Sequence, residues 1–513
     1  MQETAQFLKK TMLLMHPGTG VSFPFSGPEA FAGFRVSDES RFSEAPRRRN
    51  SRTRDADVRR APGPICVAAC LEDEGHECRV IDLRIEGEEK GLALCRSFDP
   101  DVIGLQCNFT TERRRTVHLA RTIRRLMPDA FVVVGGHDAS RDPLWFNQPE
   151  FDVIAVGDGE EVMPQLVDAL EHYAELKKVP GLWVRIGDDW MHTGPAAVRE
   201  DLDTLPMPAR HLISGYADSY YINFRKPLAL METARGCPFK CNFCSVWKFH
   251  ESTFRQKSPE RVVRELQQIS APNVFITDDI FWMDVRRGEE MARQIKAAGI
   301  KKYFTVQTRT DIICKFPHLI EMWKDCGNLA IFLGLESVTD EGLDAVNKKN
   351  KASNNVKAIE ILKDLGVGFT PNFIVDPGWE LEDFERLRNW IDETAAFNSG
   401  FSILTPLPGT DLWESAKKSI TTEDWEMYDI VHAVLPTRLP LEEFYEEYSK
   451  LWRHTIDVRF RHRGRMRTYF QMGAALATRK VSLSSLRKGM NIAKVFSRPE
   501  TFLKAHRTGT ATH

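Results

Sequence analysis

The chain has 513 residues, of which 42% are hydrophobic and 28% are charged, so it is long enough for two or three globular domains and is not disordered throughout. Its formal net charge of −2 gives no general attraction to nucleic acid. We find neither a secretory signal nor a run of about 18 apolar residues that could span a membrane, and we therefore expect a cytoplasmic protein. Thiols stay reduced in the cytoplasm, so the ten cysteines favour metal or redox chemistry over disulfides.

The N-terminal part of the chain alternates short apolar runs with amphipathic helices. The runs predict strands at residues 11–17, 76–84, 100–108, 130–138 and 151–160. The segment between the third and fourth strands has apolar residues at helical spacing, namely Val117, Ala120, Ile123 and Leu126. This alternation predicts an α/β domain over residues 1–200, with a doubly wound, Rossmann-like parallel sheet whose ligand site lies beyond the carboxyl ends of the strands.

One segment of this domain breaks the alternation. Residues 18–64 are rich in Arg, Ser, Gly and Pro and show no hydrophobic period. A segment of that composition cannot bury enough apolar surface to fold, so we predict a disordered insertion there. It falls between the first strand and the helix that should follow it.

A second series of strands and helices follows a linker at residues 200–212. Helices such as 258–269 and 352–366 separate its strands, which we predict at residues 228–234, 273–279, 302–309, 329–337, 367–378 and 399–409. These are too few strands for a full eightfold barrel, and they predict a partial (βα)6 barrel over residues 213–420. Residues 421–513 should form a mainly helical, basic C-terminal region.

The segment RGCPFKCNFCSVWKF, residues 235–249, directly follows the first predicted barrel strand and contains Cys237, Cys241 and Cys244. It should therefore lie at the carboxyl end of the barrel, where barrel sites are built. A four-iron, four-sulfur cluster takes one thiolate per iron, so three cysteines leave one iron free to bind a substrate or cofactor. Zinc sites prefer paired CxxC units, so the spacing is less typical of the alternative, a zinc site completed by Cys314, Cys326 or His250.

The CxxxCxxC motif resembles that of the radical S-adenosylmethionine (SAM) superfamily, in which the open iron binds the amino and carboxylate groups of SAM. The resemblance implies that the three cysteines hold a [4Fe-4S] cluster and that Phe243 packs beside the adenine. Polar side chains at the ends of later strands should complete the SAM site. Each could be an ordinary solvated residue, but their shared face favours binding, and they are Asp278, Arg309, Glu336 and Asn372.

The strand-end loops of the N-terminal sheet resemble those of the cobalamin-binding domains that precede some radical SAM barrels. Glycines there would let the backbone approach a large flat corrin closely. The alternative is a Rossmann-like sheet without a ligand. The cobalamin-binding residues that the resemblance implies are Gln106, Asn108, Gly135, Gly136, His137, Gly157, Gly159 and Glu160. No DxHxxG motif is present, so we assign neither His16 nor His137 as a lower ligand of cobalt.

Over most of its length the chain is similar to two groups of cobalamin-dependent radical SAM enzymes, the hopanoid C-3 methylases and the anaerobic magnesium-protoporphyrin IX monomethyl ester oxidative cyclases. Residues 439–456 and 494–506 look more like the methylases. That resemblance implies a radical C-methyltransferase, in which a 5′-deoxyadenosyl radical takes hydrogen from an unactivated ring carbon of a hopanoid lipid and methylcobalamin supplies the methyl group. Flavodoxin or ferredoxin would deliver the electron.

Two other functions compete with methyl transfer. The cyclase alternative uses the same radical for oxidation and hydration of a porphyrin ring. A third class, an electron carrier without catalysis, is disfavoured because it would need no SAM-binding face. The products distinguish the three: a methylated lipid, an oxidised porphyrin, or neither.

The C-terminal region has a one-sided charge. Residues 458–499 contain no Asp or Glu and mix Lys and Arg with apolar residues such as Phe460, Leu476 and Phe496. Helices of that kind can lie in the headgroup layer of an anionic membrane, where a hopanoid would also be found. We therefore expect peripheral contact with the inner face of the membrane; the alternative is a helical cap on the barrel. No nucleic-acid-binding module accompanies the patch, so we expect no nucleic-acid partner.

Overall fold

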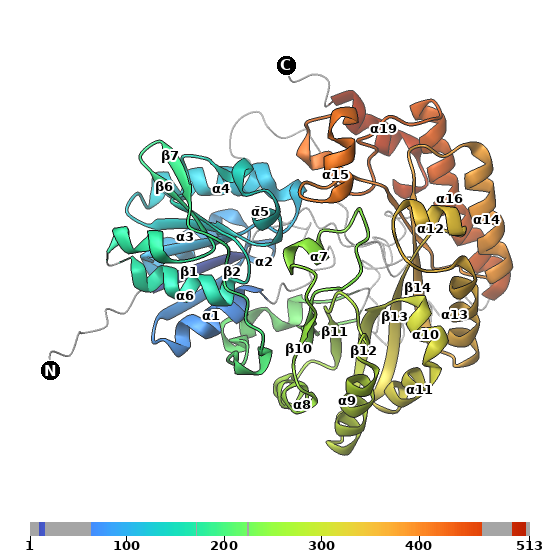
Figure 1. Ribbon diagram of the computed structural model, residues 1–513, viewed down its shortest axis with the longest axis horizontal. Coiled ribbons are helices and arrows are strands. Elements are labelled where there is room, and N and C mark those ends of the chain that lie inside the picture. Colours follow the sequence, from blue (N-terminus) through green and yellow to red (C-terminus); the bar gives the residue numbers. More distant parts are fainter. Residues whose placement is uncertain (1–9, 16–62, 171, 223–224, 464–494, 509–513) are drawn as a thin grey trace.

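The computed structural model describes residues 10–15, 63–170, 172–222, 225–463 and 495–508. Figure 1 shows a sheet-based N-terminal domain beside a larger barrel-like domain, on which the C-terminal helices pack. The predicted insertion at 18–64 lies outside the described residues, except for Gly63 and Pro64, which begin helix α1 (Gly63–Asp73). The predicted insertion therefore ends two residues too late, because residues 63 and 64 are helical.

The N-terminal domain is built on a seven-stranded sheet with the order β2-β1-β3-β4-β5-β6-β7. Its strands are β1 (Lys10–Met15), β2 (Glu77–Asp82), β3 (Val102–Gln106), β4 (Phe131–Gly135), β5 (Val153–Ala155), β6 (Leu182–Ile186) and β7 (Asp189–His192). The strands from β1 to β5 pair in parallel, which confirms the predicted core of the sheet. The hairpin of β6 and β7 was not predicted; it pairs antiparallel with β5, so the sheet is mixed.

Helices cover both faces of this sheet, as a doubly wound domain requires. Helices α1 and α6 (Gly159–Ala169) pack on one face, and α3 (Glu88–Phe98) and α4 (Arg113–Leu126) pack on the other. The apolar face predicted for α4 is correct at Ala120 and Ile123 but wrong at Leu126, which is 40% exposed. Leu119 is buried instead, because the helical period turns the last residue of α4 away from the sheet.

The second domain is a six-stranded, curled parallel sheet with the order β15-β14-β13-β12-β11-β8, which confirms the partial barrel. Its strands are β8 (Leu228–Met231), β11 (Asn273–Ile276), β12 (Lys302–Thr308), β13 (Gly327–Glu336), β14 (Gly368–Val375) and β15 (Gly400–Ile403). The helices that connect them lie on the outside of the curl (Figure 1). The longest of these are α8 (Pro259–Gln268), α9 (Val285–Ala297), α11 (Pro317–Asp325), α13 (Ala352–Asp364) and α14 (Leu381–Thr394).

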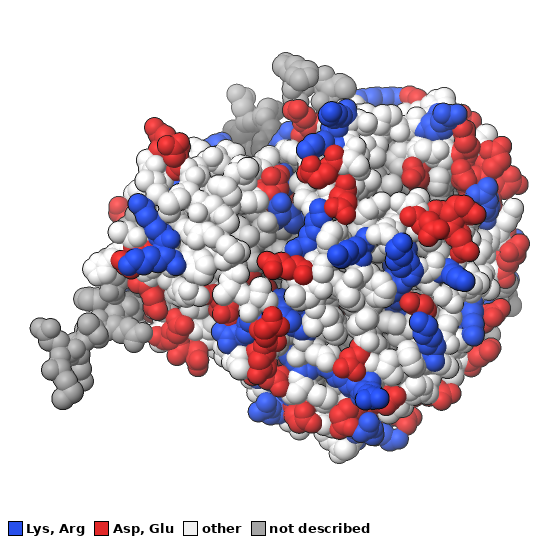
Figure 2. Space-filling view, in the orientation of Figure 1, with Lys and Arg blue, Asp and Glu red and all other residues white. Residues whose placement is uncertain are grey.

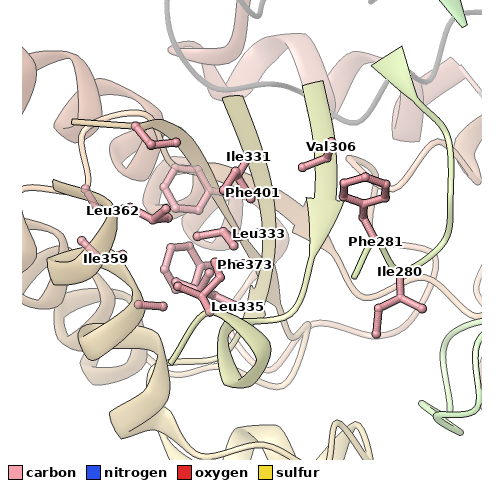
Figure 3. Close-up of a cluster of buried hydrophobic side chains, with 14 of the residues drawn as sticks. Ile280, Phe281, Val306, Ile331, Leu333, Leu335, Ile359, Leu362, Phe373 and Phe401 are labelled. Atoms are coloured by element: carbon pink, nitrogen blue, oxygen red, sulfur yellow. The ribbon is translucent and has the colours of Figure 1, made fainter. Parts of the chain in front are cut away.

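Alternate side chains of β13 point to opposite faces of the sheet, one of which is the hydrophobic core between the sheet and the outer helices. Ile331, Leu333 and Leu335 are buried and meet the side chains of α13, β14 and β15 (Figure 3). Because successive residues of a strand point to opposite faces, Phe332 and Gly334 face the other way. The pairing with β14 is irregular between Gly334 and Glu336, so Glu336, with φ +62°, ends the strand outside this alternation.

The linker between the two domains is fastened to the barrel. Arg210 donates from Nη1 to the carbonyl oxygen of Leu230 at 3.1 Å and forms an ion pair with Glu265 of α8. Arg261, also on α8, donates to the carbonyl oxygen of Leu205 at 2.9 Å. These buried contacts hold the linker in one path across the barrel.

The C-terminal region is mainly helical, as predicted, and α16 (Leu441–Arg463) packs against α14 and α19 (Pro499–Thr508). Of the predicted membrane segment, residues 464–494 lie outside the described residues. Val458 and Phe496 are buried, and the ring centre of Phe496 lies 4.8 Å from that of Trp452. The membrane prediction is therefore wrong for Phe496, which belongs to the barrel core.

The surface of the described residues shows no single-sign field on the face drawn in Figure 2, where acidic and basic side chains alternate over the barrel. Among the helices that the structure describes, none combines the length and apolarity needed to cross a membrane.

Candidate active site

The three motif cysteines lie on one long loop with a short antiparallel stem. Strands β9 (Ala234–Arg235) and β10 (Arg255–Gln256) form the stem, and residues 236–254, which we call the cluster loop, run between them and include α7 (Val246–Phe249). At the start of the loop, Gly236 has φ +89° and lies so close to the chain that a Cβ would sit 2.2 Å from the carbonyl oxygen of Thr253. Only glycine fits there, so the loop can close over its own stem.

The thiols of the loop are largely enclosed. Cys241 is buried, and Cys237 and Cys244 are partly buried. Burial raises the pKa of all three thiols, that of Cys244 to about 12, because a thiolate is poorly solvated there. Three soft ligands that release their protons only to a metal suit an iron–sulfur cluster, whose irons would compensate the thiolate charges.

The proposed fourth ligands of a zinc site are not placed for that role. Cys326 immediately precedes β13 and so lies at the amino end of the barrel, opposite the cluster loop. Cys314 donates to the carbonyl oxygen of Asn354 at 3.3 Å, and Nδ1 of His250 lies 3.1 Å from Arg255. The residues described here therefore favour a cluster with three cysteine ligands.

Two cations lie beneath the cluster loop. The guanidinium carbon of Arg309 is 3.7 Å from the ring centre of Phe239, and Nζ of Lys348 is 2.7 Å from Oε1 of Glu336. Burial raises the pKa of Cys241, and the charges of Lys348 and Arg309 oppose that shift. Lys348 was not predicted from the sequence, where a lysine in the polar run NKKN reads as a solvated residue.

The predicted SAM contact Asp278 and its neighbour Asp279 brace the loop. Asp278 is buried and accepts hydrogen bonds from the backbone N–H of Thr233 at 2.6 Å and from its hydroxyl. Its neighbour Asp279 is more exposed and accepts from the backbone N–H of Gly236 at 3.0 Å. Burial raises the pKa of Asp278 to about 6 and that of Asp279 to about 7. Of the two, Asp279 has the freer carboxylate.

Of the remaining predicted SAM contacts, Arg309 follows β12 and Glu336 ends β13, whereas Asn372 lies within β14 and Phe243 on the cluster loop. Arg309 donates to the carbonyl oxygens of Lys348 and Lys349 at 2.9 and 2.8 Å. Asn372 is buried within β14, and Phe243 lies half-buried between two of the cysteines. Glu336 has φ +62° and also lines a cavity of about 610 Å³ beside α14, together with Ser337, Thr339, Phe373, Trp379 and Arg386.

The N-terminal sheet brings its predicted ligand residues together at the ends of β3 and β4, where Gln106 pairs with Gly135. Asn108 accepts at Oδ1 from the backbone N–H of His137 at 3.0 Å. Gly136 has φ +104°, and a Cβ there would meet Oδ1 of Asn108 at 2.6 Å, so this glycine allows two loops to cross. The side chains of Gln106 and Asn108, which end this edge, are polar and uncharged.

This edge touches the cluster loop. Nε2 of His137 lies 2.7 Å from Oγ of Ser245, the residue after the third cysteine, and its ring is 4.7 Å from that of Phe249. Burial lowers the pKa of His137 to about 3, so the ring is neutral. The two predicted cofactor sites, which the sequence describes separately, are therefore adjacent.

The loop after β5 carries the other predicted cobalamin contacts and packs against the rest of the protein. Gly157 and Gly159 pack closely on the protein itself, since a Cβ at these positions would meet Ala196 at 2.7 Å and Val67 at 2.9 Å. Glu160 is buried and accepts from Nη2 of Arg235 at 2.5 Å. This part of the predicted cobalamin site thus faces the stem of the cluster loop.

One arginine at the same edge has spare hydrogen-bond donors. Arg141 ends the short helix α5 (His137–Arg141) and donates from Nη2 to Thr110 at 3.1 Å and to Asp138. Its Nε and Nη1 atoms are buried and have no hydrogen-bond partner among the described residues. Cobalamin carries amide side chains around its corrin, and such donors, with Gln106 and Asn108, fit a ligand rich in carbonyl oxygens.

Comparison with known proteins agrees with this arrangement. The profile of the Radical SAM superfamily matches residues 231–391, and that of the B12 binding domain matches residues 63–167. The chain is 35% identical over 387 residues to the hopanoid C-3 methylase of Methylococcus capsulatus, which covers 75% of this chain and 74% of that protein. It is 28% identical to the anaerobic magnesium-protoporphyrin IX monomethyl ester cyclase of Rubrivivax gelatinosus, over 66% of this chain and 62% of that protein.

The fold has a counterpart of known structure. The cobalamin-dependent S-adenosylmethionine radical enzyme OxsB, with aqua-cobalamin and S-adenosylmethionine bound, superposes with a TM-score of 0.64 at 15% identity, covering 98% of this chain and 80% of that one. The chain therefore belongs to the cobalamin-binding radical SAM enzymes of the methyltransferase type. Its cofactors are a [4Fe-4S] cluster, SAM and cobalamin, as predicted from the motifs.

Proposed function

We propose that this enzyme methylates an unactivated ring carbon of a hopanoid lipid, at C-3. The similarity to a hopanoid C-3 methylase over 75% of the chain supports this substrate. The observation that carries the proposal is the contact between His137 and Ser245, because it puts the edge proposed for the methyl donor against the loop proposed to generate the radical. A ring carbon between them could lose hydrogen and gain a methyl group without leaving the site.

In this proposal the barrel residues hold the radical source. Cys237, Cys241 and Cys244 bind the cluster and leave one iron open for SAM. When bound, the cluster supplies the electron that cleaves SAM, and cobalamin supplies a methyl group. The residues proposed to orient SAM are Phe243, Asp278, Arg309, Glu336 and Asn372.

The positions of these side chains suggest different tasks. Asp278 would act through Thr233, because both of its oxygens are engaged there. Glu336 is paired with Lys348 and lines the neighbouring cavity, so it can exchange the lysine for a hydroxyl or ammonium group of SAM.

The N-terminal edge would hold the corrin through Gln106, Asn108, the backbone at Gly135 and Gly136, and the spare donors of Arg141. We do not assign His137 to cobalt, because its Nε2 lies 2.7 Å from Oγ of Ser245 and the sequence has no DxHxxG motif. The lower face of the corrin should therefore lack a protein histidine. The close domain contact would exclude water and oxygen from the reacting groups.

The partners and location follow from the sequence. We propose flavodoxin or ferredoxin as the electron donor and a cytoplasmic enzyme that contacts the inner face of the membrane. Residues 464–494, which mix basic and apolar side chains, are the proposed membrane segment.

The test is product analysis on anaerobic, reconstituted enzyme offered a hopanoid and magnesium-protoporphyrin monomethyl ester in parallel. We expect a C-3-methylated hopanoid, with S-adenosylhomocysteine and 5′-deoxyadenosine formed in equal amounts. A methyl-deuterated SAM would place the label in the lipid. An oxidised porphyrin and an unchanged hopanoid would overturn the proposal in favour of the cyclase reaction.

A further inference from the structure

The stem of the cluster loop carries an unfavourable pair of like charges. In the register of β9 and β10, Arg235 lies directly opposite Arg255. Both residues are buried, with 7% and 5% of their surface exposed. Like charges opposite each other destabilise an antiparallel pair, and burial raises that cost unless each charge has a partner. The stem therefore needs anions to close.

Two of those anions come from the N-terminal domain. Glu160 accepts from Nη2 of Arg235 at 2.5 Å. Asp158 bridges the pair, with its Oδ2 atom 3.3 Å from Nη1 of Arg235 and 2.8 Å from Nη1 of Arg255. The barrel itself contributes Glu232, whose Oε2 accepts from Nε of Arg235 at 2.7 Å. Without the N-terminal carboxylates, Glu232 would remain paired with Arg235, and Arg255 would keep no ion pair among the described residues.

The same stem fixes the start of the cluster loop. Arg235 is followed by Gly236, whose N–H is bonded to Asp279 and whose Cα packs against Thr253. Cys237 comes next, so a shift of the stem moves the first cluster ligand. Because the stem closes both ends of the loop, all three cysteines depend on it.

The loop with Asp158 is in turn connected to the cobalamin edge. The backbone N–H of Gly157 donates to Oγ of Ser140 at 3.2 Å, and Ser140 lies on α5, the helix that begins at His137. A ligand that orders α5 would thus also order the segment that neutralises the stem.

We infer that Asp158 and Glu160 are positioning residues for the iron–sulfur cluster: they neutralise the stem arginines, and the cluster loop reaches its binding geometry only with the N-terminal domain docked. By linkage, cobalamin binding and iron retention then stabilise each other. The inference rests on the cofactors of the proposed function but not on its substrate.

The experiment measures how fast a chelator removes iron from the anaerobic, substrate-free holoenzyme. In the double variant Asp158→Asn/Glu160→Gln we expect iron loss to accelerate about fivefold or more, the usual range of such coupling. The matched control is Arg388→Gln, which removes another partly buried ion pair, with Glu447 at 2.7 Å, away from the stem. It should lose iron at the wild-type rate, and far-UV circular dichroism verifies that both variants are folded.

A rescue variant separates charge from packing. Adding Arg255→Gln to the double variant removes the like-charge pair, so iron loss should slow toward the wild-type rate, whereas a packing role would make it faster still. Hydroxocobalamin should slow iron loss in the wild type and have no effect in the double variant. The inference is overturned if the double variant keeps its iron normally, or if it loses cobalamin affinity alone. Neither readout requires a product, so the substrate proposal stands or falls separately.

Discussion

The carboxyl edges of the two sheets differ in where their charged side chains find partners. At the barrel edge, charged groups are paired within the barrel: Asp278 with Thr233, and Glu336 with Lys348. At the N-terminal edge, Gln106 and Asn108 are neutral and Asp138 is paired with Arg141, whereas the carboxylates of the loop after β5 are bonded to the barrel.

The difference follows from what each edge has to hold. A small, charged ligand such as SAM needs a rigid frame of charges, which internal pairs provide. A corrin is large and carries neutral amides. The carboxylates of Asp158 and Glu160 are therefore not needed to hold it, and they bind the barrel instead. A charged residue at a strand end is therefore not by itself a ligand, and its partners decide its task.

The largest effect should come from the barrel edge. Cys241→Ala removes one of three thiolates, and we expect iron to be lost completely, because thiolates and not packing hold it. Iron analysis and electron paramagnetic resonance of the reduced protein measure this. The far-UV circular dichroism should stay close to that of the wild type, and full iron retention would disprove the cluster assignment.

A second variant tests whether Asp278 braces its own domain. Asp278→Ala leaves the buried N–H of Thr233 without an acceptor, and we expect the free energy of unfolding to fall by about 2–3 kcal/mol. Urea denaturation checks this. Asp278→Asn is the control, since it keeps an oxygen for that N–H and should recover most of the loss. Unchanged stability with weaker SAM binding would mean that Asp278 is a direct ligand only.

The contact between the edges should make the free energy of unfolding depend on pH. Burial, aided by the charge of Arg141, lowers the pKa of His137 from 6.5 to about 3. Between these values the unfolded chain binds a proton that the folded chain does not, so stability falls as the pH falls below about 6.5. We expect His137→Gln to flatten the dependence by about 1 kcal/mol per pH unit between about pH 6 and pH 5, measured by urea unfolding. An unchanged slope would show that His137 is solvated.

The smallest effect is expected at the uncharged residues of the N-terminal edge. The side chain of Gln106 makes no hydrogen bond to another described residue, so Gln106→Ala should change the free energy of unfolding by less than about 0.5 kcal/mol. Its proposed bond to cobalamin should appear as an affinity about fivefold lower, measured by absorbance titration. A loss of stability without a change in affinity would show that Gln106 supports the fold and does not bind cobalamin.

The sequence predicted the sheets because their signals are local. Apolar runs such as residues 130–138 define β4 within a few positions, and the three cysteines define the cluster loop by spacing alone. The β6–β7 hairpin was missed because Arg185 interrupts the short apolar run of β6, of which only one face is buried.

The site was less predictable because its contacts are long-range. The stem strands β9 and β10 have two residues each, too few for any periodic pattern. Glu160 and Arg235 are 75 residues apart, and nothing in the sequence distinguishes their pairing from other charge pairs. Lys348 was missed for the same reason, because its burial depends on how β13 brings Glu336 toward it.

The stem arginines also have a consequence for biosynthesis. Glu160 is synthesised 75 residues before Arg235, and domains tend to fold as they emerge, N-terminal first. The carboxylates that close the stem are then in place before the cysteines appear. A chain whose N-terminal domain has misfolded would leave the stem open and would fail to keep its iron. Maturation would in this way reserve the radical-generating cluster for molecules that can also carry the methyl donor.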